Sequence, residues 1–143
     1  MLLDRTGSIF IGERRGPLLD AWQMPQGGID PGERPIDAAW RELAEEVGTD
    51  RAELLAESRH WHAYDLPPGL TPKHWGGRYR GQSQRWFAFR FLGSDADIVL
   101  DAHEPEFSQW RWAPQDEVLR LITPFKRAVY EAVLAEFRDL LRG

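Results

Sequence analysis

Apolar residues recur every three or four positions over the segment 35–47. These positions are Ile36, Ala39, Trp40, Leu43 and Val47. Pro35 suits the first turn of a helix, where its missing N–H leaves no hydrogen bond unmade, and Gly48 suits the position just past the end. The pattern therefore predicts an amphipathic helix that begins at Pro35, ends at Val47 and buries one stripe.

A second helical stripe occupies the last part of the chain. Its members are Val129, Tyr130, Val133, Leu134, Phe137, Leu140 and Leu141. Thr123 can cap this segment with its hydroxyl group, and Pro124 can take the first helical position. We expect a C-terminal helix that packs this stripe on the core.

The remaining apolar segments are short and favour strands. They are Met1–Leu3, Ser8–Gly12, Ala21–Met24, Leu54–Tyr64, Gln84–Phe91 and Phe107–Trp112. In one of them, the alternation places Phe87, Phe89 and Phe91 on a single face. Glycine and proline are frequent in the segments 25–32 and 65–82, which predicts loops there. The predicted fold class is α/β (α+β), with a small mixed sheet and at least two helices packed on it.

Composition narrows the classes of protein. The 143 residues are 42% hydrophobic and 12% aromatic, which suits one folded domain. The net charge of −5 argues against attraction of long nucleic acid by the overall field, and we expect no DNA partner. The absence of cysteine excludes disulfides and Cys-ligated zinc. With no apolar run near the roughly 18 residues of a membrane span and no signal peptide, we expect a cytoplasmic protein.

The predicted helix 35–47 carries three glutamates on a face away from its apolar stripe. Glu42, Glu45 and Glu46 fall within an arc of about 100°. Like charges this close destabilise an isolated helix, and hard divalent cations such as Mg²⁺ relieve the repulsion with oxygen ligands. The alternative from these acids alone is a solvated acidic face.

The spacing around these glutamates favours the metal interpretation. Gly27 is followed by five residues and Glu33, and seven more lead to the sequence Arg41-Glu42-Leu43-Ala44-Glu45-Glu46-Val47-Gly48-Thr49. This segment resembles the Nudix box, G-x5-E-x7-R-E-U-x-E-E-x-G-U, with Thr49 in place of the final aliphatic residue. The likeness continues through most of the chain. It includes the runs 21–30, 81–87, 105–112 and 125–127, which are similar to the branch of RNA pyrophosphohydrolases and bacterial-type diadenosine tetraphosphate hydrolases.

The resemblance implies a Nudix fold, a mixed sheet sandwiched between helices, in a single domain over residues 1–143. The family's first strand usually begins further upstream, so the resemblance also implies that this strand is cut short at Met1. The implied cofactor is Mg²⁺, with Mn²⁺ as another possible cation. The implied metal ligands are Glu42, Glu45, Glu46, Glu106 and Gly27, of which Glu45, Glu46 and Glu106 would also be catalytic.

The resemblance further implies supporting and substrate-binding residues. Arg41 would pair within the box, and Glu33 would order the loop before the helix. The candidates for substrate binding are Arg14, Tyr64, Arg80, Phe125 and Lys126, with Arg15, Arg78 and Arg127 as further cations. Core packing is the competing interpretation for the two aromatic rings, and a surface charge is the competing interpretation for each cation.

Three functional alternatives stay open. A hydrolase of this kind would release pyrophosphate from the 5′ end of triphosphorylated RNA, or it would split dinucleoside polyphosphates. A third alternative, from another class, is a non-catalytic module that senses nucleotides. We expect a nucleotide or an RNA 5′ end as partner, no membrane partner and a monomer. His60 and His62 flank Trp61 at strand spacing, but no third ligand lies nearby in sequence to make a zinc site.

Overall fold

The computed structural model describes residues 1–14, 21–65, 81–101 and 105–142. Its main sheet has six strands, and its second sheet has two. The strands of the main sheet are β1 (Leu2–Leu3), β2 (Ile9–Arg14), β3 (Trp22–Gln23), β4 (Ala52–Glu57), β7 (Phe87–Phe91) and β8 (Phe107–Ala113). The second sheet pairs β5 (His62–Asp65) with β6 (Gly81–Gln84).

The main sheet is mixed, as the sequence predicts. Its order is β3-β2-β1-β7-β4, with β8 paired to β2. β1 runs parallel to β7, so that Leu2 is opposite Phe89, whereas the other pairings are antiparallel. A strand can pair along two edges, and β8 pairs with one edge of β2 along its whole length. β1 and β3 therefore share the other edge, which brings the loop after β3 towards the centre of the sheet.

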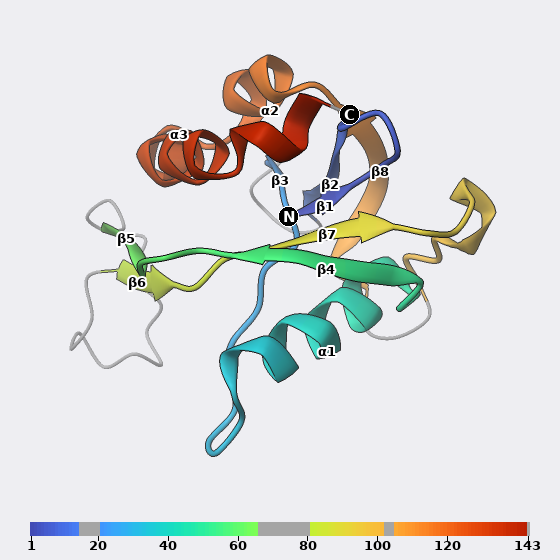
Figure 1. Cartoon of the computed structure of the whole chain (residues 1–143), viewed down its shortest axis with the longest axis horizontal. Coiled ribbons are helices and arrows are strands. Elements are labelled where there is room, and N and C mark those ends of the chain that lie inside the picture. The colour runs from blue at the N-terminus through green and yellow to red at the C-terminus, as the bar shows by residue number, and fades with distance from the viewer. Residues whose placement is uncertain (15–20, 66–80, 102–104, 143) are drawn as a thin grey trace.

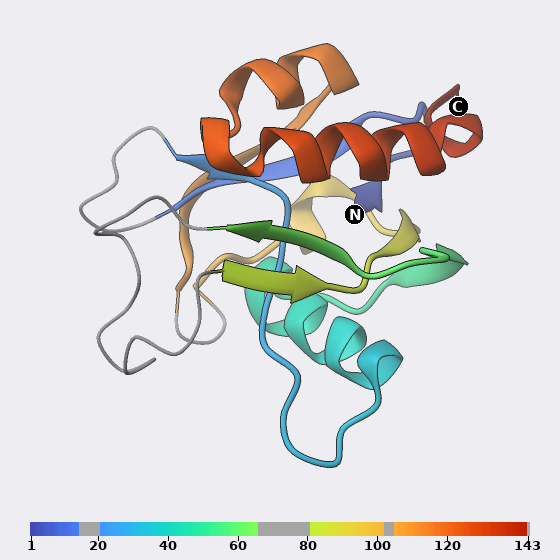
Figure 2. The same ribbon diagram turned by 90° about the vertical axis from the view of Figure 1, so that its left-hand side faces the viewer.

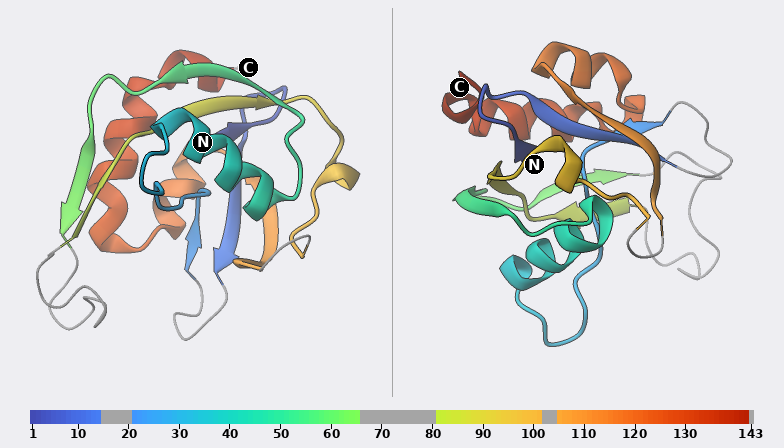
Figure 3. Two further views of the ribbon diagram at one scale, coloured as in Figure 1. Left: turned by 90° about the horizontal axis from the view of Figure 1, so that it is seen from below. Right: turned by 90° about the vertical axis from the view of Figure 1, so that its right-hand side faces the viewer.

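Helices cover both faces of this sheet. α1 (Pro35–Val47) lies on one face, and α2 (Gln115–Leu121) and α3 (Arg127–Glu136) lie on the other (Figure 1). Three 3₁₀ turns complete the described elements: η2 (Asp95–Asp97), η3 (Pro124–Lys126) and η4 (Arg138–Arg142). The β5–β6 pair lies at one end between the helical layers (Figure 2), and the further views show the same layering (Figure 3). The predicted α/β architecture is confirmed.

Each face of the sheet has its own buried cluster. On the α1 side, Leu43 and Val47 pack with Phe10 and with the phenylalanines of β7, and the Trp40 ring meets Phe89 edge-on at 4.6 Å. On the α3 side, Tyr130 and Val133 pack with Leu3, Ile9 and Ile11. The alternation of β1 and β2 explains this division, because successive side chains of a strand point to opposite faces. The predicted Phe87, Phe89 and Phe91 face is confirmed.

The helix predicted over 35–47 has these bounds in the structure. Gly48 closes it with φ of 81°, and its N–H donates to the carbonyl of Ala44 at 3.0 Å. A side chain at this position would also collide with the backbone of Val99. Glycine is therefore required at the helix stop both by its conformation and by the close approach.

Three local predictions were wrong. Thr123 makes no side-chain capping bond, because Pro124–Lys126 form a 3₁₀ turn and α3 starts only at Arg127. The extended segment 54–64 is two strands in different sheets, broken at Ser58, which hydrogen-bonds the backbone of Trp86. Gln84 belongs to β6 rather than to the strand of Phe87–Phe91. The C-terminal apolar stripe nevertheless packs on the core as predicted.

Candidate functional site

The loop after β3 lies against the carboxylates of α1. The backbone N–H of Gln26 donates to Glu46 Oε2 at 3.0 Å. At the next residue, a Cβ on Gly27 would collide with the carboxyl group of Glu42, whereas a Cβ on Gly28 would meet nothing within 4 Å. Gly27 is therefore the position where the backbone must come close to a glutamate of the helix.

Arg41 joins this loop to the helix. Its Nε and Nη2 donate to the two oxygens of Glu33, both at 2.9 Å, and Nη2 also donates to the carbonyl of Gly28 at 2.8 Å. Its Nη1 donates to Glu42 at 2.8 Å and reaches Glu45 at 3.4 Å. Hydrogen bonds from Arg41 lower the pKa of Glu33 to about 2. The guanidinium thus offsets the repulsion between acids that the sequence placed side by side.

Glu46 differs from its helical neighbours because it is buried. Only 5% of this residue is exposed, whereas the side chain of Glu45 is 44% exposed. Burial raises the pKa of Glu46 to about 9, and the nearby charges of Glu42 and Glu106 add to the rise. The pKa of Glu42 is also raised, chiefly by burial. The three acids therefore differ in environment, because Glu46 is buried whereas Glu45 remains exposed.

These carboxylates suit a hard divalent cation chemically. All supply oxygen, and a buried acid with a raised pKa gains most from a cation that restores its charged form. In the described ranges, no three acidic or histidine side chains form a ready metal-binding group. Arg41 forms ion pairs with Glu42 at 2.8 Å and with Glu45 at 3.4 Å. Glu106, exposed just before β8, lies near enough to influence the pKa of both Glu42 and Glu46.

A buried cation contacts β3, the strand that leads into this loop. Lys126 is 6% exposed, and its Nζ lies 3.3 Å from Gln23 Oε1, 5.7 Å from the centre of the Tyr64 ring and 6.0 Å from that of Phe125. Burial lowers the pKa of Lys126 to about 8, with a smaller contribution from the charge of Arg14. A desolvated ammonium with a neutral partner is well suited to receive an anion.

The sequence-predicted residues are therefore brought together in two groups. Glu33, Arg41, Glu42, Glu45, Glu46 and Glu106 gather around α1, while Tyr64, Phe125 and Lys126 form the aromatic and basic group. Arg14, at the end of β2, is close enough to influence the pKa of both Glu46 and Lys126. Arg15, Arg78 and Arg80 lie outside the described residues. His62 hydrogen-bonds Glu136 at 3.2 Å.

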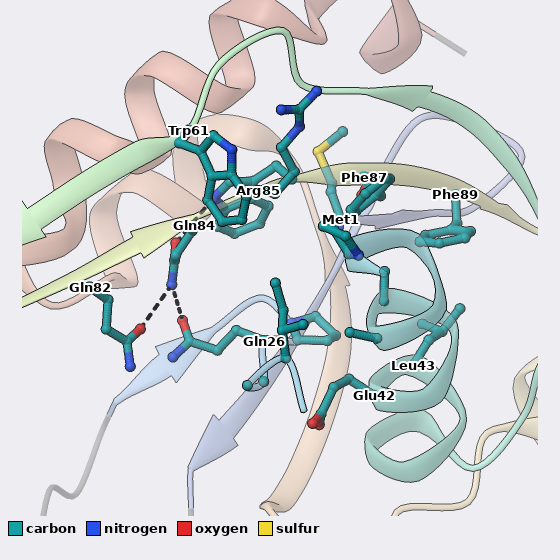
Figure 4. A pocket seen from close by; sticks show the side chains of 18 of the residues that line it. Met1, Gln26, Glu42, Leu43, Trp61, Gln82, Gln84, Arg85, Phe87 and Phe89 are labelled. Carbon is teal, nitrogen blue, oxygen red and sulfur yellow. Dashed lines mark hydrogen bonds between the residues drawn. The ribbon is translucent and has the colours of Figure 1, made fainter. Parts of the chain in front are cut away.

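A cavity of about 460 Å³ adjoins the first group (Figure 4). Its lining includes the apolar residues Leu2, Phe87 and Phe89, together with Glu42 and Gly27. Three glutamine side chains, Gln26, Gln82 and Gln84, stand along its wall. Sequence reasoning missed these amides as functional candidates, although Gln82 and Gln84 occupy alternate positions of a family-like stretch.

Replacing Lys126 with methionine is expected to stabilise the metal-free protein by about 3 kcal/mol at neutral pH. The folded pKa of about 8 lies below the ordinary value of 10.5, so the unfolded state binds more protons between these values. The charged lysine therefore costs stability below about pH 8, and that cost disappears as pH rises towards 10.5. Urea unfolding of both proteins at pH 7 and pH 10 measures the difference.

The matched control is Arg127→Met, which removes an exposed cation at the next position. Because exposed ion pairs contribute little, this control should change stability by less than about 1 kcal/mol. If Lys126→Met destabilised the protein equally at both pH values, Lys126 would not carry the burial cost described above.

Proteins of known family resemble this chain in sequence. The family described as NUDIX domain matches residues 1–133. The RNA pyrophosphohydrolase of Rickettsia conorii is 51% identical over 142 residues, which are 99% of this chain and 88% of that protein. The RNA pyrophosphohydrolase of Rickettsia typhi is 50% identical over 142 residues, which are again 99% of this chain and 88% of that protein.

Solved structures agree in fold. The dihydroneopterin triphosphate pyrophosphohydrolase of E. coli superposes with a TM-score of 0.73 at 20% identity, covering 94% of this chain and 92% of that one. The Ap4A hydrolase of C. elegans, in a binary complex, gives a TM-score of 0.66 at 15% identity, covering 96% and 95%. Among the described residues, no helix has the length and apolar character to cross a membrane.

Proposed function

The chain belongs to the Nudix family, and from this membership we propose that it is an RNA pyrophosphohydrolase, which releases pyrophosphate from the 5′ end of triphosphorylated RNA. The observation that carries the proposal is the buried Glu46 beside Glu42, together with the buried cation Lys126 against Gln23 of β3. The 51% identity with an RNA pyrophosphohydrolase over nearly the whole chain supports the choice of substrate.

The carboxylates form the cation-binding half of the proposed site. Members of the Nudix family generally use divalent cations, and we assign Mg²⁺ here, held by Glu42, Glu45, Glu46 and Glu106 with the backbone of Gly27. When bound, Mg²⁺ reverses the local negative field, neutralises phosphate charge and increases the acidity of water. Arg41 positions Glu42 and Glu45 and, through Glu33, fixes the loop that presents Gly27.

Proton transfer is assigned to the same acids. Hydrolysis of a phosphoanhydride needs a base that takes the proton of the attacking water, and Glu45, Glu46 and Glu106 are the candidates. The rest of the rate enhancement comes from positioning and charge stabilisation, because phosphoryl transfer requires little else from the protein.

The second group holds the substrate in this proposal. Lys126 and Arg14 bind phosphate oxygens, and Arg80 is a third candidate, from outside the described residues. Tyr64 and Phe125, whose ring centres are 5.8 Å apart, offer faces to a base, and such stacking contributes about 1–3 kcal/mol per base. Because the chain as a whole carries a net charge of −5, these nearby cations must supply the attraction for an anionic substrate.

The experiment compares two substrates, 5′-triphosphorylated RNA and diadenosine tetraphosphate, at equal concentration. We expect Mg²⁺-dependent release of pyrophosphate from the RNA, with a higher kcat/KM than for the dinucleotide. A higher kcat/KM for diadenosine tetraphosphate would instead identify a dinucleoside polyphosphate hydrolase. Binding of both substrates without turnover in Mg²⁺ or Mn²⁺ would favour a nucleotide-sensing module.

A further inference from the structure

The glutamines beside the cavity are joined in one hydrogen-bonded group. Gln84 is its centre: Nε2 lies 3.2 Å from Gln26 Oε1 and 3.3 Å from Gln82 Oε1 (Figure 4). The indole Nε1–H of Trp86 donates to Gln84 Oε1 at 3.0 Å. On the far side, the Tyr64 hydroxyl donates to Gln82 Oε1 at 2.8 Å. We call Gln26, Gln82, Gln84, Tyr64 and Trp86 the amide cluster.

Trp86 determines the direction of every bond in the cluster. An indole N–H can only donate, so the Gln84 atom that faces it must be the carbonyl oxygen. The NH₂ group of Gln84 then faces Gln26 and Gln82, and each of these glutamines must turn its own oxygen towards Gln84. Trp86 is fixed in turn because it is buried and its ring meets Tyr130 edge-on at 5.6 Å.

The consequence is that Gln26 and Gln82 both present NH₂ groups away from Gln84. Figure 4 shows these two nitrogen atoms on the same side of the cluster, the side away from Trp61 and Arg85. Within the described part of the chain, no acceptor is bonded to Gln82 Nε2. The side chain of Gln26 lies close to the Tyr64 hydroxyl and partly offsets the rise that burial causes in the pKa of Tyr64.

The position of the cluster connects the two halves of the proposed site. Gln26 is anchored at one end, where its backbone N–H donates to Glu46 at 3.0 Å. Tyr64 is anchored at the other end, where its ring lies against Phe125 and beneath Lys126 Nζ. Amide N–H groups turned to one side between a cation-binding half and a buried ammonium are suited to donate hydrogen bonds to the oxygens of an anionic substrate.

We propose that Gln84, oriented by the indole of Trp86, is a positioning residue that holds Gln26 and Gln82 as N–H donors towards the phosphate oxygens of the substrate. The proposal rests on the proposed function for the identity of that substrate. Gln84 itself does not touch the reacting atoms. Its effect is to prevent the two amides from turning over and presenting oxygen, which would repel phosphate.

Substitutions at Gln84 test this directly. Gln84→Glu keeps the shape and still accepts from Trp86, but its carboxylate requires Gln26 and Gln82 to turn their NH₂ groups inward. Gln84→Met keeps the length and removes the hydrogen bonds without imposing the reversed direction. We expect KM for 5′-triphosphorylated RNA to rise about tenfold in Gln84→Glu and about threefold in Gln84→Met, with kcat within about twofold of wild type.

Ser83→Glu is the control for charge, since it adds a carboxylate at the adjacent position outside the cluster. Its KM should rise less than that of Gln84→Glu. Thermal unfolding of each variant checks that the fold is retained. Equal KM values for Gln84→Glu and Ser83→Glu, or a loss confined to kcat, would overturn the proposal.

A second measurement does not depend on turnover. In ¹⁵N-labelled protein, addition of inorganic pyrophosphate should shift the side-chain NH₂ resonances of Gln26 and Gln82 in the wild type, but not in Gln84→Glu. The Trp86 indole resonance should remain in both proteins. If these amide shifts occurred in a protein that failed to hydrolyse RNA, the proposed function would be refuted, but the role of the amide cluster in binding phosphate would be supported. Unchanged amide resonances in an active enzyme would refute the role of the cluster alone.

Discussion

Glu46→Gln is expected to lower kcat by about 1,000-fold or more, because the proposed site loses a charged ligand that is held in a desolvated place. The side chain keeps its shape, so Gln26 N–H can still donate to a side-chain oxygen at this position. The protein should therefore fold normally. Its metal-free form should be as stable as wild type or more so, since the burial that raises the pKa of Glu46 penalises a charge there.

Steady-state kinetics in Mg²⁺, together with thermal unfolding with and without the ion, measure both effects. Wild type should gain stability on binding Mg²⁺, whereas Glu46→Gln should gain less. Glu131→Gln is the matched control: it makes the same chemical change at an exposed position on α3, where Glu131 pairs with Arg127. Near-normal turnover by a well-folded Glu46→Gln, or by the double variant Glu45→Gln, Glu46→Gln, would refute the assignment of these acids.

Gly27→Ala is expected to reduce kcat by about 100-fold, whereas Gly28→Ala should stay close to wild type. A methyl group on Gly27 would occupy the place of the Glu42 carboxyl group, so either that group or the loop must move. A methyl group on Gly28 enters open space. Displacements of about 1 Å at a catalytic group can cost this much activity.

Both variants replace a glycine with alanine at adjacent positions. A difference between them therefore reports the collision of the new methyl group with Glu42. Kinetics at saturating substrate should separate them, because the loss belongs to the reacting geometry rather than to binding. Mg²⁺ should also stabilise Gly27→Ala less than Gly28→Ala in thermal unfolding. Equal activity in the two variants would show that the approach of Gly27 to Glu42 has no catalytic importance.

The sequence predicted the helix of the site well for a physical reason. The 3.6-residue repeat, Pro35 at its start and Gly48 past its end are local signals, and they all agree over 35–47. The burial of each individual acid could not be predicted from the sequence. The helical arc put Glu42, Glu45 and Glu46 together, but it could not show that the loop after β3 covers Glu46 while Glu45 stays exposed.

The errors arose where tertiary contacts override local pattern. The break in segment 54–64 depends on Ser58, whose hydrogen bonds reach Trp86 across the fold. α2 was not among the predicted elements. It has one buried residue, Val118, in seven positions, so its sequence shows no helical periodicity. The amide cluster joins residues up to 60 positions apart, which no spacing along the chain could have indicated.

The most direct test of the central claim is the release of pyrophosphate from purified 5′-triphosphorylated RNA by the wild-type chain, with and without Mg²⁺, beside Glu46→Gln. We predict one pyrophosphate per RNA end and a 5′-monophosphate product, only in the presence of the cation and only with the wild type at an appreciable rate. No release by the folded wild-type protein in Mg²⁺ or Mn²⁺, or equal release by Glu46→Gln, would contradict the account.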